Sequence, residues 1–80
     1  MDINIKSKAS IGDIVYTVEC YNGEFTTSKP LIVDAVYTET TSEGTMCAYR
    51  VCYAGEYMQI GEANCFTDFT ECTEWCNQHN

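Results

Sequence analysis

The alternation of apolar and polar positions predicts short β-strands over most of the chain. Ile11–Tyr21 is dense in β-branched and aromatic residues, which favour strands. It runs into Asn22-Gly23, a pair that predicts a tight hairpin because both central positions of a type I′ turn need a positive φ angle. Glu24–Ser28 is then expected to return as the antiparallel partner of the first strand.

Three more strands follow the same alternation. They are predicted at Leu31–Thr38, Met46–Tyr53 and Tyr57–Ile60. Pro30 separates the first of them from the hairpin, because proline has no N–H to donate to a strand ladder. A polar turn at residues 38–44 and an Ala54-Gly55 turn are expected to join the three strands.

The period of two also assigns side chains to faces of these strands. Leu31, Val33 and Ala35 are expected on one face, with Asp34 on the other. The residues predicted to be largely buried in the whole fold are Val15, Val33, Val36, Tyr49, Val51, Phe66, Phe69 and Cys72.

The pattern changes to a helical period near the C-terminus. Phe69, Cys72 and Cys76 recur at i, i+3 and i+7, which is the spacing of one helix face. Thr67 precedes them and is a favourable N-cap residue. A short amphipathic helix over residues 68–77 is therefore predicted.

Four or five antiparallel strands followed by one helix indicate a mainly β protein. A small sheet with strongly bent strands tends to close into a barrel that hides its edges. Eighty residues ordinarily form one domain. The expected organisation is a single domain 1–80, with an N-terminal lead at 1–9, a β-barrel at 10–66 and a C-terminal helix at 67–77.

The composition adds a strong acidic bias. Twelve acidic residues against four basic ones give a formal net charge of −8, and Arg50 is the only base in residues 30–80. Such a surface repels phosphate backbones, so direct binding of nucleic acid is not expected. Its natural partners are basic surfaces, including the nucleic-acid channels of other proteins.

Six cysteines and one histidine raise the question of a metal site. Cys72, Cys76 and His79 would share a stripe on the predicted helix, but structural zinc sites need four ligands, usually in paired knuckles. Cys47 and Cys52 have a knuckle spacing, but their opposite parity on a strand points them to opposite faces. Buried free thiols are the favoured interpretation, with no metal, no cofactor and no disulfide under reducing conditions. Metal binding by the helix stripe stays open as the alternative.

The sequence contains no recognisable catalytic motif and no segment typical of a membrane span. The only histidine is the penultimate residue, and no phosphate-cradling glycine loop, HExxH motif or nucleophile elbow is present. The tyrosines on predicted strands are expected to form a half-buried wall rather than a stacking platform for bases. The opening residues lack the apolar stretch of a secretory signal, and no segment has the roughly eighteen apolar residues of a membrane span. A non-catalytic cytoplasmic protein is expected.

Two motifs resemble a layout found in small SH3-like-barrel proteins of Firmicutes phages and mobile elements. The residues that match are Ile11, Gly12, Asp13, Val15 and Tyr16 in the opening strand, and Glu62, Phe66, Thr67 and Glu71 at the close. Cys72 and Cys76 depart from the family, which has small or aliphatic helix residues there, and the Asn-Gly hairpin lengthens the first loop. The resemblance covers residues 10–77. It implies an SH3-like barrel and a gene expressed in a bacterial host cytoplasm.

The resemblance also implies a functional context, because small acidic proteins of such genomes include inhibitors of host defence, anti-CRISPR proteins among them. The leading hypothesis is a non-catalytic binder that docks on a basic surface of a host protein, such as a nuclease or CRISPR effector, as a nucleic-acid mimic. The candidate partner-binding residues are Glu39, Glu43, Glu62, Asp68, Glu71 and Glu74. One alternative is an oligomeric sponge that holds a nucleotide through Lys6, Lys8, Lys29 and Arg50. Another is an accessory structural domain, and the oligomeric state is not predicted.

Overall fold

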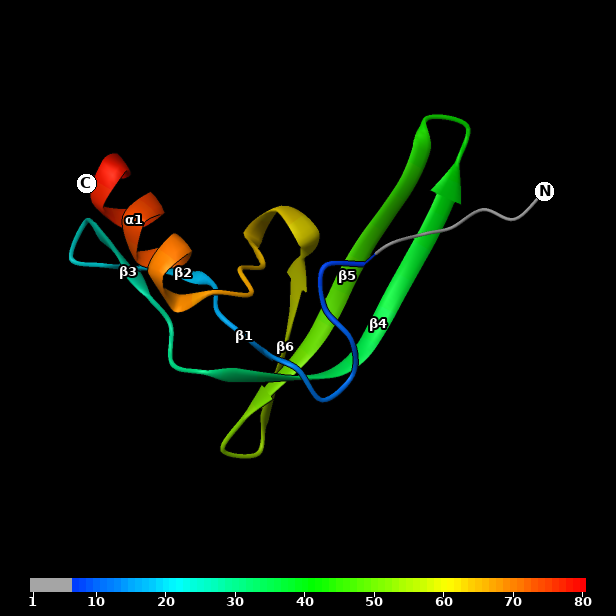
Figure 1. The fold of residues 1–80 in the computed structure, drawn as a ribbon, viewed down its shortest axis with the longest axis horizontal. Helices are drawn as coiled ribbons and strands as arrows, with labels where there is room; N and C mark the ends of the chain where they lie inside the picture. Colours follow the sequence, from blue (N-terminus) through cyan, green and yellow to red (C-terminus); the bar gives the residue numbers. More distant parts are fainter. Residues whose placement is uncertain (1–6) are drawn as a thin grey trace.

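The computed structural model describes residues 7–80 and is mainly β (Figure 1). The elements are β1 (Ile14–Val15), β2 (Val18–Tyr21), β3 (Glu24–Thr27), β4 (Leu31–Thr41), β5 (Gly44–Tyr53), β6 (Glu56–Gly61), the 3-10 helix η1 (Glu62–Asn64) and the helix α1 (Phe69–His79). The predicted fold class is confirmed, with antiparallel strands in a barrel-like arrangement and one short C-terminal helix. Residues 1–6 of the expected lead, including Lys6, lie outside the described residues.

The strands form two sheets. A four-stranded sheet has the order β1-β4-β5-β6 and curls into a half-barrel, and β2 and β3 form a separate two-stranded sheet. All pairs of neighbouring strands are antiparallel. Figure 1 shows α1 beside β2 and β3 at one end of the molecule, while the tip of the β4–β5 hairpin lies at the other end.

The prediction of a single strand over Ile11–Tyr21 is wrong, because this segment is divided between the two sheets. Its β1 portion pairs with β4, whereas its β2 portion pairs with β3. Between them, Tyr16 exchanges backbone hydrogen bonds of 2.8 Å with Phe66, and the Thr17 N–H donates to the Ser28 hydroxyl at 3.0 Å. The chain therefore changes partner at these two residues without losing backbone hydrogen bonds.

The two predicted dipeptide turns are confirmed. Asn22 and Gly23 have φ angles of 52° and 79°, and Ala54 and Gly55 have φ angles of 51° and 82°. Two consecutive positive values match the type I′ turn, whose twist fits that of a two-residue hairpin. Both hairpins are thus closed by the residues that the sequence pattern identified.

The β4–β5 hairpin is longer than predicted. The polar segment at 38–44 is strand almost throughout, and only Ser42 and Glu43 lie between the last pair, Thr41 and Gly44. Threonine favours the extended backbone, and the Thr40 and Thr45 hydroxyls lie 3.1 Å apart across the ladder. Polarity at these positions therefore reflects an exposed strand pair and not a loop.

A bulge in β4 changes the predicted assignment of faces. The register with β5 shifts between Val33 and Ala35, so that Asp34 is the extra residue. Val36, not Ala35, then lies opposite the buried Tyr49 and packs against the core. The predicted position of Ala35 on the core face is therefore wrong, because alternation cannot continue through a bulge.

The core lies on one face of the four-stranded sheet. Of the residues predicted to be buried, Val15, Val33, Tyr49, Val51 and Cys72 are buried, and Val36 and Phe66 are half-buried. The predicted burial of Phe69 is wrong, since 53% of this residue is exposed. Its ring contacts Tyr16 edge to face, with centroids 5.5 Å apart, at the surface of the first helical turn.

The helix α1 covers the β2–β3 hairpin, and we call these three elements the helix unit. Buried Cys72 and Cys76 lie on the inner side of the helix. Thr73 is 2.8 Å from Thr27 between hydroxyl oxygens, and the Trp75 ring meets Phe25 edge to face at 5.4 Å. The helix unit therefore has its own small apolar contact zone, separate from the core of the sheet.

The N-cap of α1 is Asp68, not the predicted Thr67. The Asp68 carboxylate accepts a hydrogen bond of 3.3 Å from the Glu71 N–H. Both residue types are favourable N-caps, and the aspartate also interacts with the positive end of the helix dipole. Within the described residues, α1 is too short and too polar to cross a membrane.

Candidate functional site

The structure separates the six predicted carboxylates into three places. Glu39 and Glu43 lie on the outer part of the β4–β5 hairpin, which we call the arm and define as Thr38–Cys47. Glu71 and Glu74 lie on α1, and Asp68 is its N-cap, at the opposite end of the molecule (Figure 1). Glu62 lies in η1, next to the end of β6. The six residues therefore do not form one continuous surface.

Glu62 has a structural contact with the core. Its carboxylate accepts hydrogen bonds from the Tyr49 hydroxyl at 3.2 Å and from the Lys8 backbone N–H at 3.3 Å. Burial of Tyr49, together with the adjacent Glu62 carboxylate, raises the pKa of the tyrosine hydroxyl. Glu62 thus joins the N-terminal segment to the sheet, and only part of its carboxylate is free for a partner.

The carboxylates on α1 are presented outward. Glu71 and Glu74 are exposed, while Cys72 and Cys76, on the inner side of the same helix, are buried. Asp68 is also exposed, although one of its oxygens caps the helix. These three carboxylates have fixed positions because the helix that holds them is packed against β3.

Each basic side chain in residues 7–80 has an internal contact. The Lys8 ammonium donates to the carbonyl oxygens of Glu62 and Cys65 at 3.0 and 3.4 Å. Lys29 lies 5.1 Å from the centre of the Tyr53 ring.

Arg50 is the third of these bases, and it is paired with Asp34 across the β4 bulge. Its Nε donates to Asp34 Oδ2 at 2.7 Å, and its Nη2 donates to the same oxygen. This contact raises the pKa of the guanidinium group.

The acidic side chains of residues 7–80 are in the opposite situation. Nine of these eleven side chains are exposed, and the only ion pair within this part of the chain is that of Arg50 with Asp34. The excess negative charge therefore faces solvent at both ends of a molecule whose longest extent is 46 Å.

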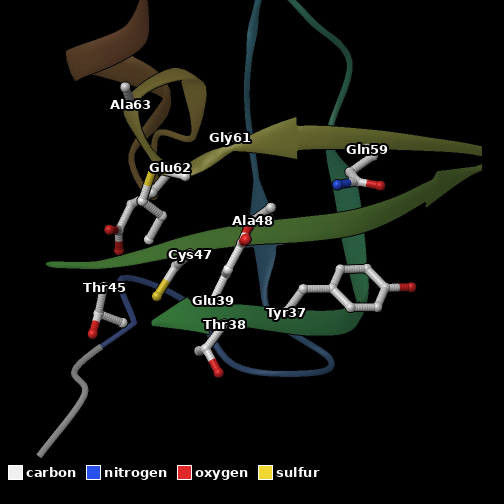
Figure 2. Close-up of a pocket in the computed structure, with 11 residues that line it drawn as sticks. Tyr37, Thr38, Glu39, Thr45, Cys47, Ala48, Gln59, Gly61, Glu62 and Ala63 are labelled. Atoms are coloured by element: carbon white, nitrogen blue, oxygen red, sulfur yellow. The ribbon is translucent and has the colours of Figure 1, made fainter. Parts of the chain in front are cut away.

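A shallow groove extends over the face of the four-stranded sheet opposite the core, which we call the outer face, and around the end of β6, where Thr45, Cys47 and Glu62 also line it. One row of the sheet runs from Tyr37 in β4 through Ala48 in β5 to Gly61 in β6, so side-chain size falls from large to none. Figure 2 shows Ala48 between Tyr37 and Glu62. The groove has a volume of about 550 Å³ and is also lined by Glu39 and by Met46, which is 64% exposed.

A second cavity of about 290 Å³ bears on the nucleotide hypothesis. Lys29 lines it together with Glu19, Glu56 and Tyr57. The single ammonium group is thus accompanied by two carboxylates and already lies over an aromatic ring. This arrangement is unfavourable for a phosphate, because like charges repel.

The helix stripe proposed as the metal alternative does not converge. Cys72 and Cys76 are buried, whereas the His79 ring stacks on Trp75 with centroids 3.8 Å apart, and its Nδ1 is 2.7 Å from the Trp75 carbonyl oxygen. Within the described part of the chain, no three His, Cys, Asp or Glu side chains are grouped for a metal ion. All six cysteines are free thiols.

Comparison of the chain with protein-family models, curated proteins and solved structures gives no match.

The groove is the feature that sequence reasoning did not identify. Tyr37, Ala48 and Gly61 are far apart in the sequence and share a row only because of the register of three strands. The bulge at Asp34 also decides which face Tyr37 occupies. The available signal was Gly61, which directly follows the strand predicted over Tyr57–Ile60 and is the last residue of β6 in the structure.

Proposed function

We propose that this chain is a non-catalytic binding protein whose exposed carboxylates dock on a basic surface of another protein. The observation that supports this proposal is the imbalance in contacts. The three described bases are each engaged within the chain, while nine carboxylates face solvent. The electrostatic potential outside the molecule is therefore negative at both ends, and it attracts basic surfaces.

The finer proposal is a host protein of the bacterial cytoplasm as the partner, with a nucleic-acid-binding nuclease of a defence system as its class. A groove that binds nucleic acid is lined by Lys and Arg and tracks a regular series of negative charges. Carboxylates at the two ends of a 46 Å molecule suit such a groove better than they suit a small pocket. The resemblance to proteins of phages and mobile elements supplies the context, and the protein would act as an inhibitor.

The chemistry of the described side chains favours binding over catalysis. Burial raises the pKa of the Cys65 and Cys72 thiols, which keeps them protonated and weakly nucleophilic at neutral pH. The His79 ring is held against Trp75 at the end of the helix, away from the groove. The groove itself is lined by two carboxylates, the Gln59 amide, the hydroxyls of Tyr37, Thr38 and Thr45, and small or apolar side chains.

Capture from a bacterial lysate tests the proposal. Immobilised protein is expected to retain basic nucleic-acid-binding proteins at low salt and to release them as ionic strength rises, because exposed charges are screened within a Debye length of about 8 Å at 0.15 M salt. Added duplex DNA is expected to compete for the same proteins.

A charge-reversed protein is the matched control for this capture. The Glu71→Lys, Glu74→Lys variant keeps the fold, since exposed charges contribute little to stability. Its capture of basic proteins is expected to fall clearly below that of the parent. Equal capture by parent and variant, with no competition by DNA, would contradict the proposal.

A further inference from the structure

The outer face carries a continuous apolar row across all four strands of the main sheet. The pairing places Ile14, Ile32, Cys52 and Tyr57 side by side. Ile14, Ile32 and Tyr57 are 53%, 51% and 62% exposed. A sheet face with this much apolar surface is normally covered by another layer. In residues 7–80, the elements that cover the sheet lie on its core face.

The next row contains the only charged pair on this part of the face. Arg50 uses two of its nitrogens on one oxygen, Asp34 Oδ2. No described residue contacts Arg50 Nη1 or Asp34 Oδ1 by a hydrogen bond, and the two side chains are 46% and 38% exposed. Arg50 also lies 5.4 Å from the centre of the Tyr57 ring. One donor group and one acceptor oxygen therefore remain free, next to each other, between the apolar row and the groove, with Gln59 as the neighbour of Arg50 on β6.

The third row contains the groove. Tyr37 stands at its β4 end, Ala48 lies in the middle, and Gly61 closes it at β6. Tyr37 is 43% exposed, so its ring projects from the face beside a floor of small residues. Projection and recess thus lie in neighbouring strands of one row.

We propose that two copies of this chain pack outer face against outer face, about a two-fold axis that runs parallel to the strands between β4 and β5. Such an axis places β4 of each copy over β5 of the other, and it keeps each row opposite the same row. Paired sheets in proteins pack about 10 Å apart at a small angle. The interface is isologous, so every contact occurs twice.

The charged pairs are complementary in this arrangement. Arg50 of one copy faces Asp34 of the second copy, because these residues lie on β5 and β4. The free nitrogen and the free oxygen then meet across the axis, and two ion pairs become a closed ring of four charges. An axis perpendicular to the strands would instead oppose Arg50 to Arg50, which is repulsive.

The shapes are complementary in the same arrangement. Tyr37 of one copy lies over Ala48 of the other, so the projecting ring enters the groove. In the apolar row, Ile32 on β4 lies over Cys52 on β5, while Ile14 and Tyr57, on the edge strands of the curled sheet, lie at the rim of the contact. In these two rows, large side chains therefore meet small ones or apolar side chains meet each other.

The composition of the outer face favours a second copy of this chain over the basic partner proposed above. The proposed dimer does not depend on that partner. The face holds two tyrosines, two isoleucines, Met46 and Arg50 and no lysine, and its acids are Asp34, which is paired, and Glu39, at the edge; interface cores are likewise enriched in aromatic residues, Met and Arg and depleted of Lys. The carboxylates of α1 lie on another element and remain free in the pair. Glu39, at the edge of the face, meets Met46 of the other copy.

A charge exchange tests the arrangement by sedimentation equilibrium, in reducing buffer at about 0.15 M salt, where repulsion between the distant acids is screened. The parent is expected to dimerise. Arg50→Asp and Asp34→Arg are each expected to weaken dimerisation by about tenfold or more, because like charges then face each other. An equimolar mixture of the two variants is expected to restore a heterodimer, since opposite charges face each other again.

Two further variants serve as controls. Glu24→Arg makes the same charge change as Asp34→Arg on the helix unit, and it is expected to leave dimerisation unchanged. Gly61→Tyr fills the groove floor, where an added Cβ meets no atom within 4 Å and the backbone is extended, so the fold is retained while dimerisation weakens.

Three outcomes would overturn the inference. The first is a parent that stays monomeric at about 1 mM, a concentration at which even weak pairs associate. The second is a dimer that survives both Arg50→Asp and Gly61→Tyr. The third is a mixture of folded Arg50→Asp and Asp34→Arg variants that stays monomeric, which would exclude the proposed axis.

Discussion

The arm and the helix unit lie at opposite ends of the molecule, and both carry exposed carboxylates, two in the arm and four in the helix unit. The arm has only two strands, and within residues 7–80 no third strand pairs with it. Residues 38–46 are all exposed, and Cys47 is the first buried residue towards the core. In the helix unit, Cys72 and Cys76 are buried beneath α1, and aromatic and hydroxyl contacts fix the helix on β3.

The difference in packing shows how a pair of carboxylates in the arm and a pair on the helix can act differently in binding. The arm holds Glu39 and Glu43 on a ribbon with many exposed backbone hydrogen bonds, which is a property of segments with low local stability. The helix unit holds Glu71 and Glu74 at a constant spacing of three residues on one packed helix. We therefore expect the helix carboxylates to be preorganised for a partner and the arm carboxylates to adapt to it.

The largest effect is expected from the two thiols that pack the helix unit. The double substitution Cys72→Ala, Cys76→Ala removes two buried sulfur atoms and is expected to lower the free energy of unfolding by about 2 kcal/mol, about 1 kcal/mol for each site. Urea denaturation measures this change, and Cys20→Ala, at an exposed site, is the control. Complete loss of folding, with zinc found in the purified parent, would contradict the interpretation of these residues as packing groups.

A rise in pH is expected to destabilise both the sheet and the helix unit. Burial raises the pKa of Cys65 beneath the sheet and of Cys72 beneath the helix above the ordinary value of 9.0. The folded chain keeps these protons while the unfolded chain releases them. The stabilising contribution is therefore complete below pH 9.0 and is lost as the pH rises through the folded pKa.

Denaturation curves between about pH 7 and about pH 10 measure this loss. Cys72→Ala is expected to reduce the slope, and Cys20→Ala is expected to leave it unchanged. The same slope in Cys72→Ala and in the parent would show that the helix thiol does not contribute.

A smaller effect is expected at the start of α1. Asp68→Ala removes the carboxylate that caps the Glu71 N–H and is expected to lower the free energy of unfolding by about 1 kcal/mol. Thr67→Ala is the matched control, because Thr67 is exposed and does not cap the helix. Thermal unfolding followed by circular dichroism compares the two, and a larger loss for Thr67→Ala would restore Thr67 as the N-cap.

The smallest effect is expected in the arm. Thr40→Ala removes a hydroxyl contact with Thr45 across the ladder and is expected to lower the free energy of unfolding by only about 0.2–0.5 kcal/mol. Hydrogen exchange is expected to be faster at Met46, whose N–H lies in a hydrogen-bonded pair of the arm ladder, and unchanged at Phe25 in the helix unit. Equal acceleration at both ends would show that the arm and the helix unit open together.

Local signals in the sequence were sufficient where the structure depends on neighbouring residues. The turns at Asn22 and Ala54 need positive φ angles, and the helix follows a change of period near Thr67. These features involve residues close in the chain, so their chemistry is visible in the sequence. The class of the fold followed from them.

Signals that depend on distant partners could not be read in the same way. The division of the first strand at Tyr16 depends on a bridge to Phe66, fifty residues later. The bulge at Asp34 and the exposure of Phe69 likewise depend on which strand or ring lies opposite. For the candidate site, the acidic residues were visible from composition, but their separation into three places and the groove at Tyr37 required the strand register.

The most direct test of the proposed function compares the two ends in one kinetic measurement. The basic partner found by lysate capture is mixed with the parent, with Glu71→Lys, Glu74→Lys, or with Glu39→Lys, Glu43→Lys, and association rates are measured at two ionic strengths. We predict slower association and a weaker dependence on salt for both variants, with the larger change for the helix variant, because its carboxylates are preorganised. Rates equal to those of the parent at both ionic strengths, for both variants, would contradict the account and assign binding to a surface without these carboxylates.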